Sequence, residues 1–122
     1  MGSKTEVEDT IIRNSILDNC RHKVQTHNSS SSPRVNNSGI SNFVSTGTQA
    51  FTLEAPAVGS HKRLVKSATA SAAMTVTCTG GATLNAAGNT VMTFDAADDM
   101  IELMGISTTR WVVIVNSSVA LS

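Results

Sequence analysis

From Ile40 to the C-terminus the hydrophobic pattern has a period of two, and this periodicity constrains the fold more than any other feature of the sequence. Met74, Val76 and Cys78 alternate with threonines, and Leu64 lies in a strand with the basic residues Lys62, Arg63 and Lys66. Such alternation indicates half-buried β-strands. Threonine is β-branched and packs well on the pleated surface of a strand. The expected strands cover residues 42–45, 49–53, 62–68, 74–79, 82–85, 90–94, 100–104, 109–115 and 119–121.

Turn residues separate these segments at intervals of about eight to twelve residues, a spacing typical of sandwiches and barrels. Gly80-Gly81 and Asn116-Ser117-Ser118 are examples. The predicted fold class is therefore all-β, with a small antiparallel β-sandwich or barrel-like domain over residues 40–122.

The first 39 residues are polar and rich in Asn and Ser, and they contain no aromatic residue. Thr5 and Glu8 have the spacing of a capping box, which favours a short helix up to about Cys20. The alternative is an extended arm whose apolar side chains dock singly. Residues 26–39 are too polar to bury much surface, so we expect a linker there and an arm-plus-linker unit over 1–39. The apolar side chains expected to anchor the arm are Val7, Ile11, Ile12, Ile16 and Leu17.

The composition indicates a thin core. The four aromatic residues are Phe43, Phe51, Phe94 and Trp111, and the chain has no tyrosine. Large aromatic side chains normally supply much of the buried area of a core. We therefore expect copies of the chain to bury surface against each other, the alternative being a modest monomeric core.

The charges and cysteines indicate which partners and which cellular compartment to expect. The net charge is zero, so neither a nucleic-acid nor a membrane partner is expected, because both favour a basic excess. Cys20 and Cys78 are too few and too far apart for a disulfide framework, which indicates free thiols and folding in a reducing cytoplasm. We also expect neither a membrane-spanning segment nor a secretory signal.

Few residues suggest catalysis or metal binding. Cys20, His22 and His27 are metal-binding residue types, but a fourth ligand is missing. The acidic turn and strand with Asp95, Asp98, Asp99 and Glu102 could hold Ca²⁺ or supply a carboxylate pair for glycoside hydrolysis. Solvated carboxylates are the more usual outcome. His61 has no partner at a defined spacing, and none of the common catalytic motifs is present. No catalytic residue, metal or cofactor is therefore expected, and the chain is not predicted to be an enzyme.

The acidic segment has a counterpart of opposite sign in the strand that carries Lys62, Arg63 and Lys66. In a ring of identical subunits, opposite patches can meet head to tail. We therefore predict an intersubunit contact between the basic strand and the segment with Asp95, Asp98, Asp99 and Glu102.

Several short motifs resemble a β domain of tailed-bacteriophage structural proteins, namely head decoration (cement) proteins and related fibre or spike modules. The resemblance covers about residues 49–116 and leaves residues 1–39 unmatched. Glu54 stands where the family often has proline, which loosens the turn. The motifs that carry the resemblance are FTLEAPAVG at 51–59, KRLV at 62–65, TFDAAD at 93–98, IEL at 101–103 and RWVV at 110–113.

The resemblance implies a virion protein made in the host cytoplasm and placed on the outer surface of the capsid. Its partners would be the major capsid protein and further copies of itself in a homo-oligomer, with a homotrimer expected. The arm would clamp the capsid proteins and order as it binds. The alternatives are a head or tail fibre module and, from another class, a glycan-binding β module.

Overall fold

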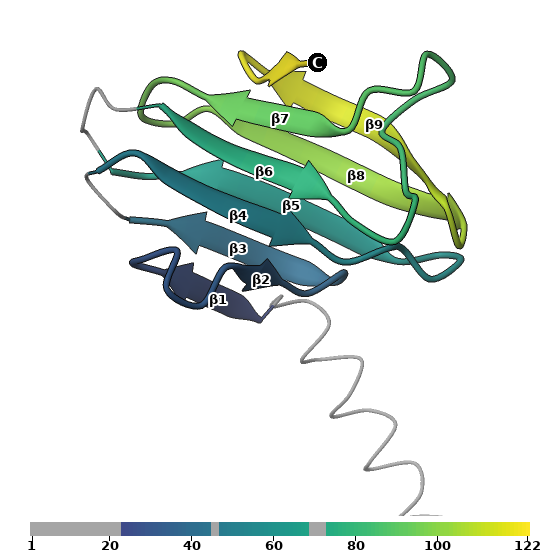
Figure 1. Cartoon of the computed structure of the whole chain (residues 1–122), viewed down its shortest axis with the longest axis horizontal. Coiled ribbons are helices and arrows are strands. Elements are labelled where there is room, and N and C mark those ends of the chain that lie inside the picture. The colour runs from purple at the N-terminus through teal and green to yellow at the C-terminus, as the bar shows by residue number, and fades with distance from the viewer. Residues whose placement is uncertain (1–22, 45–46, 69–72) are drawn as a thin grey trace, which may run out of the picture.

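The computed structural model describes residues 23–44, 47–68 and 73–122, which form ten strands and no helix (Figure 1). The predicted arm helix and its anchors lie outside these residues. The strands are β1 (Val24–His27), β2 (Arg34–Val35), β3 (Gly39–Phe43), β4 (Gln49–Leu53), β5 (His61–Lys66), β6 (Met74–Cys78), β7 (Val91–Phe94), β8 (Met100–Ser107), β9 (Arg110–Ser117) and β10 (Ala120–Leu121).

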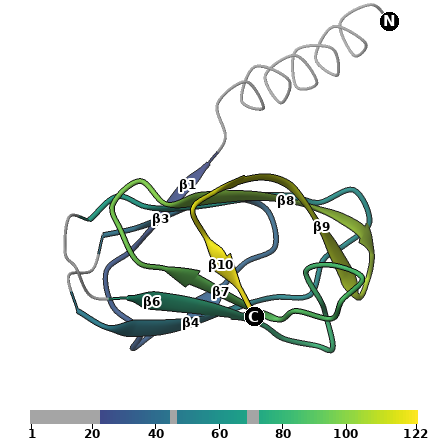
Figure 2. The ribbon, with the colours of Figure 1, turned by 90° about the horizontal axis from the view of Figure 1, so that it is seen from above.

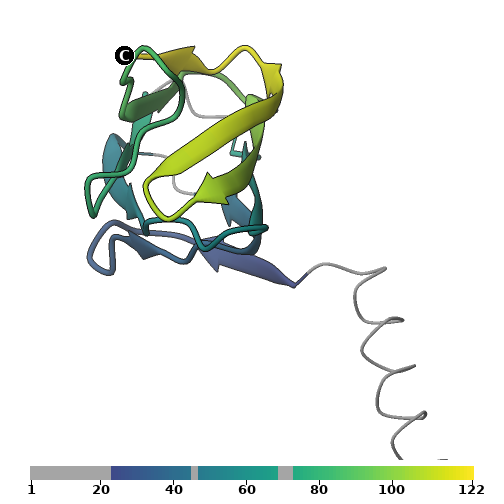
Figure 3. The same ribbon diagram turned by 90° about the vertical axis from the view of Figure 1, so that its right-hand side faces the viewer.

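The described strands form two sheets that face each other across one apolar core (Figure 2). Sheet A has the order β1-β3-β5-β8-β9, and sheet B has the order β10-β7-β6-β4-β2. Figure 3 shows the same two layers of strands from the side. The predicted all-β sandwich is confirmed.

The strand pairing is mixed, whereas the sequence pattern predicted antiparallel pairing throughout. β1, β3 and β5 are parallel neighbours, and so are β2, β4 and β6. The remaining pairs are antiparallel. The cause is the path of the chain, which crosses to the other sheet after each of the first five strands. Successive strands within one sheet therefore run in the same direction.

The predicted linker contains parts of both sheets. β1 pairs with β3, so that Val24 lies opposite Ile40, and β2 pairs with β4. Val35 is fully buried and anchors β2 to the core. The sheets thus begin with Val24 rather than Ile40, because backbone hydrogen bonds and a few buried side chains order a segment that its composition assigns to a linker.

The core follows the predicted alternation. The ring centroids of Phe43 and Phe51 are 4.8 Å apart, and those of Phe43 and Phe94 are 6.1 Å apart. Trp111 is fully buried, and its backbone amide donates to the carbonyl oxygen of Thr83 at 2.8 Å. The predicted strand at 82–85 is wrong: the structure has an isolated bridge there between Thr83 and Arg110, within a loop that packs Leu84 into the core.

Gly105 fixes the position of β8 against the turn that precedes β5. Its amide donates to the carbonyl oxygen of Ser60 at 2.8 Å, and its own carbonyl oxygen accepts from the amide of Gly59 at 2.8 Å. A Cβ atom at Gly105 would overlap the carbonyl oxygen of Ala57 and lie 2.7 Å from Cβ of Pro56. Only glycine lets the two backbones approach this closely.

Candidate functional site

The outer face of sheet A is apolar over much of its extent. Exposed fractions of 46% for Ile106, 45% for Ile114 and 41% for Val115 place these side chains in contact with water on β8 and β9. Val24 is 56% exposed on β1 at the opposite edge of the sheet. Strand alternation and register add four partly buried side chains to the same face, and we call the whole set the apolar face: Val24, Ile40, Val65, Met104, Ile106, Val112, Ile114 and Val115.

A β-bulge in β9 increases the exposure on this face. The register shifts between Glu102 and Leu103, so that Val115 lies opposite Glu102 and Val113 opposite Leu103. Ile114 is the extra residue between them. A bulge of this kind bends the strand and redirects a side chain, and here it leaves Ile114 half in solvent.

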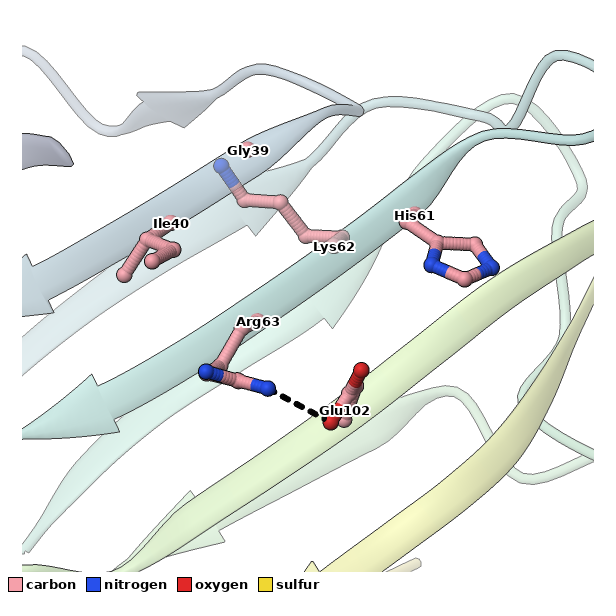
Figure 4. A pocket seen from close by; sticks show the side chains of 6 residues that line it. All are labelled: Gly39, Ile40, His61, Lys62, Arg63 and Glu102. Carbon is pink, nitrogen blue, oxygen red and sulfur yellow. Dashed lines mark hydrogen bonds and ion pairs between the residues drawn. The ribbon is translucent and has the colours of Figure 1, made fainter. Parts of the chain in front are cut away.

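An ion pair crosses the apolar face between β5 and β8. Nη2 of Arg63 lies 2.9 Å from Oε2 of Glu102, and the two side chains are 44% and 22% exposed (Figure 4). The pair borders a shallow pocket that His61 and Ile40 also line. The pocket offers about 20 Å³, which is space for one water molecule rather than for a substrate.

Lys62 belongs to the same strand as Arg63, but its side chain points into the sandwich. It is fully buried, and Nζ donates to Oδ1 of Asn36 at 2.9 Å and to the carbonyl oxygen of Ser38 at 3.0 Å. Burial lowers the pKa of Lys62 from 10.5 to about 8, an effect that the nearby negative charge of Glu54 partly offsets. Lys62 therefore holds the segment between β2 and β3 in place and is not available at the surface.

Lys66 is also buried and lies against the acidic turn that joins β7 to β8. Its Nζ donates to the carbonyl oxygen of Asp95 at 3.4 Å. Its backbone amide donates to the carbonyl oxygen of Asp99 at 3.0 Å, and the amide of Asp98 donates to the carbonyl oxygen of Lys66 at 2.7 Å. The basic strand and the acidic turn thus meet inside one chain.

Asp99 organises this turn. Its side chain is buried, and Oδ2 accepts hydrogen bonds from the amides of Asp95 at 2.9 Å and Ala96 at 3.0 Å. Asp98 adopts a left-handed conformation with φ of 69°, which completes the reversal. The exposed acidic residues of the turn are Asp95 and Asp98.

The residues predicted for the intersubunit contact therefore divide into two groups. Lys62, Lys66 and Asp99 are buried within the chain, which corrects their assignment to one exposed patch. Arg63 and Glu102 pair with each other, whereas Asp95 and Asp98 are exposed. An intersubunit role for these last four residues stays a prediction.

The predicted metal-binding residue types are not assembled in the described part of the chain. No group of three or more His, Cys, Asp or Glu residues there could hold a metal ion. Cys20 and His22 lie outside the described residues. His27 packs its ring on Phe43 with centroids 4.9 Å apart, and Nε2 lies 2.9 Å from Oγ of Ser41. Burial and the charge of Lys62 lower the pKa of His27, which favours the neutral ring.

Cys78 is a free thiol in the core. Burial raises its pKa from 9.0 to about 11, which disfavours the reactive thiolate. Cys78 therefore acts as a small apolar core residue.

The outer face of sheet B has a different chemistry. Thr75 lies opposite Thr93, and Thr77 lies opposite Thr52. All four are partly exposed, and we call this set the threonine face. Arg34 forms an ion pair with Glu54 at the β2 edge.

Sequence reasoning missed the apolar face. A signal for it was present, because the run from Trp111 to Val115 is continuously apolar and leaves no polar position for an outer side. The described residues contain no helix of the length and apolar character that crossing a bilayer requires. Comparison with known proteins finds no family model that matches the chain and no curated protein that matches it significantly.

Proposed function

We propose that this protein is a capsid decoration protein of a tailed bacteriophage, which binds the outer surface of the head and stabilises it. The observation that carries the proposal is the apolar face, because Ile106, Ile114 and Val115 expose apolar surface that a solitary domain has no need to display. The resemblance of residues 49–116 to phage structural domains supports the same assignment. The two together favour a protein whose structure is completed by neighbours in an assembly.

In this proposal the two parts of the chain have separate tasks. The sandwich self-associates, with a homotrimer expected, and the N-terminal arm clamps neighbouring copies of the major capsid protein. The arm gains affinity by avidity, since one arm per subunit binds the same shell. Clamping adjacent capsid proteins raises the barrier to their separation.

The test is binding of the full chain to phage heads that lack the protein. The substitutions Ile12→Asp and Ile16→Asp, made together, place charges among the expected arm anchors. We expect at least a tenfold loss of head binding in a co-sedimentation assay. The matched control, Thr52→Asp with Thr93→Asp on the threonine face, adds the same charge and leaves binding unchanged. Equal binding by the arm variant and the wild type would remove the clamping role.

A second candidate function, a fibre or spike module, has one observation in its favour. The parallel order β1-β3-β5 and β2-β4-β6 repeats one strand from each sheet three times within the described residues, a pattern that can be extended by stacking. Quantitative mass spectrometry of purified particles separates the two functions. A decoration protein occurs in copies comparable to the major capsid protein, and a fibre module occurs in a handful.

The structure gives less support to a glycan-binding module. Phe43, Phe51, Phe94 and Trp111 are all buried, so no phenylalanine or tryptophan ring is presented for stacking on a sugar. A glycan array tests this third function directly.

A further inference from the structure

We infer that the apolar face of sheet A is the surface through which copies of this chain bind each other. The inference deepens the self-association in the proposed function, and it assigns that role to sheet A rather than to the basic strand and the acidic turn. Surface isoleucines scattered singly need no explanation, but here Ile106, Ile114 and Val115 lie on two neighbouring strands. The free energy falls when a second apolar surface covers such a cluster and removes it from water.

The charges on this face favour a second copy as the occupant. Arg63 and Glu102 are a partly exposed basic and acidic residue side by side, and their charges cancel. A copy related by a two-fold axis presents the same two charges in the opposite order, so the contact inferred here is a dimer contact rather than the trimer contact expected from the resemblance. Arg63 of one chain can then approach Glu102 of the next without leaving an unpaired charge in the interface.

The edge of β9 beyond Trp111, where the Thr83 bridge ends, faces no other described strand and is compatible with the same occupant. The sequence from Trp111 to Ser122 contains no charged side chain and no proline, which are two of the devices that protect an edge strand from pairing. Among the described strands, the edges of sheet B are two-residue strands, and β1 has four residues, whereas β9 has eight. β9 is thus the longest edge strand among the described residues, and it borders the most exposed part of the apolar face, although its bulge at Ile114 interrupts the edge.

The size of the face is sufficient for self-association. The five strands of sheet A, about 4.8 Å apart and roughly 20 Å long, give the whole outer side of the sheet, polar positions included, an area on the order of 500 Å² on each copy. The total is on the order of 1,000 Å² for a pair of faces, which reaches the lower range of specific interfaces. Contacts along the β9 edge add to this area.

The test uses the full chain with Ile106→Glu and Ile114→Glu, two positions that are about half exposed and therefore tolerate substitution in a folded monomer. Light scattering coupled to size exclusion measures the mass, and circular dichroism checks the fold. We expect an oligomer for the wild type and a mass near 12.7 kDa for the variant. The control, Thr52→Glu with Thr93→Glu, carries the same added charge on the threonine face and remains oligomeric.

A wild-type chain that is monomeric, or a folded variant that keeps the wild-type mass, overturns the inference. If the double variant does not fold, a cysteine at position 114 decides the question. In a Cys20→Ser background, a short bismaleimide is expected to crosslink Ile114→Cys chains to each other and not Thr75→Cys chains. Equal crosslinking at the two positions overturns the inference.

Binding to phage heads is measured separately and distinguishes the inference from the proposed function. If the chains associate through sheet A but fail to bind heads, the inference stands and the decoration function fails. If the wild type is monomeric and the double variant loses only head binding, the capsid protein covers the face and the inference fails.

Discussion

The outer face of sheet A carries isoleucine, valine and methionine at many of its outward positions, whereas the central strands of sheet B carry four threonines on their outer face. Thr75 and Thr93 form a cross-strand pair on sheet B, as Met104 and Val112 do on sheet A. Threonine supports a strand and tolerates water, so strand formation alone does not require the apolar residues of sheet A. The difference between the faces therefore reports on what each face contacts.

The largest expected effect tests whether sheet A has the register that produces this difference. Gly105→Ala places a methyl group against the backbone at Ala57, and we expect a loss of about 2–3 kcal/mol in the free energy of unfolding from overpacking. Urea denaturation measures it. The control is Gly47→Ala, whose Cβ would meet only the end of the Gln49 side chain at 3.5 Å within 4 Å. If Gly105→Ala is as stable as the wild type, the close approach of β8 to Ala57 is wrong, and with it the register that places the inner and outer side chains of β8.

The second effect tests the burial of Lys62 on the inner side of β5 through the pH dependence of stability. The pKa of Lys62 is lowered to about 8 in the folded protein and is 10.5 in the unfolded chain. Above pH 8 the unfolded chain therefore holds more protons, and stability rises with pH. The expected gain is about 1 kcal/mol between pH 8 and 9.

Comparison with Lys62→Met isolates this gain. Cys78 has a raised pKa and acts in the opposite direction at alkaline pH, but its contribution is common to both proteins and cancels in the difference. Thermal unfolding at pH 7.5, 8 and 9 is the measurement. The exposed Lys23 supplies the control, since Lys23→Met is expected to keep the wild-type slope. A wild-type slope in Lys62→Met would show that the Lys62 amine is solvated.

The smallest effect concerns the ion pair on the apolar face. Arg63 and Glu102 are partly exposed, so we expect Arg63→Ala to cost the monomer about 0.5 kcal/mol, and less at high salt. A double-mutant cycle with Glu102→Ala measures the coupling by chemical denaturation of a non-associating background. A coupling several times larger would mean that water does not reach the pair, in conflict with its exposure.

The sequence predicted the class of fold well because alternation is a local signal. The inward side chains of β4, β6 and β7 follow from the period of two, and so does the burial of Trp111. The mixed pairing was not predictable, since parallel and antiparallel neighbours have the same alternation. β1 and β2 were missed because their order depends on hydrogen bonds to distant strands rather than on their own composition.

The candidate site was harder to predict than the fold. Lys62, Arg63 and Lys66 form one basic segment in the sequence, but alternation places Arg63 outside and the two lysines inside. Counting charges without their strand parity therefore suggested a patch that does not exist as a unit. The acidic turn also has fewer exposed charges than its sequence suggests, because the Asp99 carboxylate accepts hydrogen bonds from the backbone of its own turn.

The crossing of the chain between sheets after each early strand also sets the order of folding. β8 and β9 are joined by a tight turn at Thr108 and Thr109, and a hairpin of this kind closes in about 1–10 μs. β1, β3 and β5 meet only after the chain has visited the opposite sheet, and such non-local pairing is slow. We expect the C-terminal hairpin to form while the N-terminal strands are still unpaired. During that delay the unpaired strand edges can pair with strands of other chains.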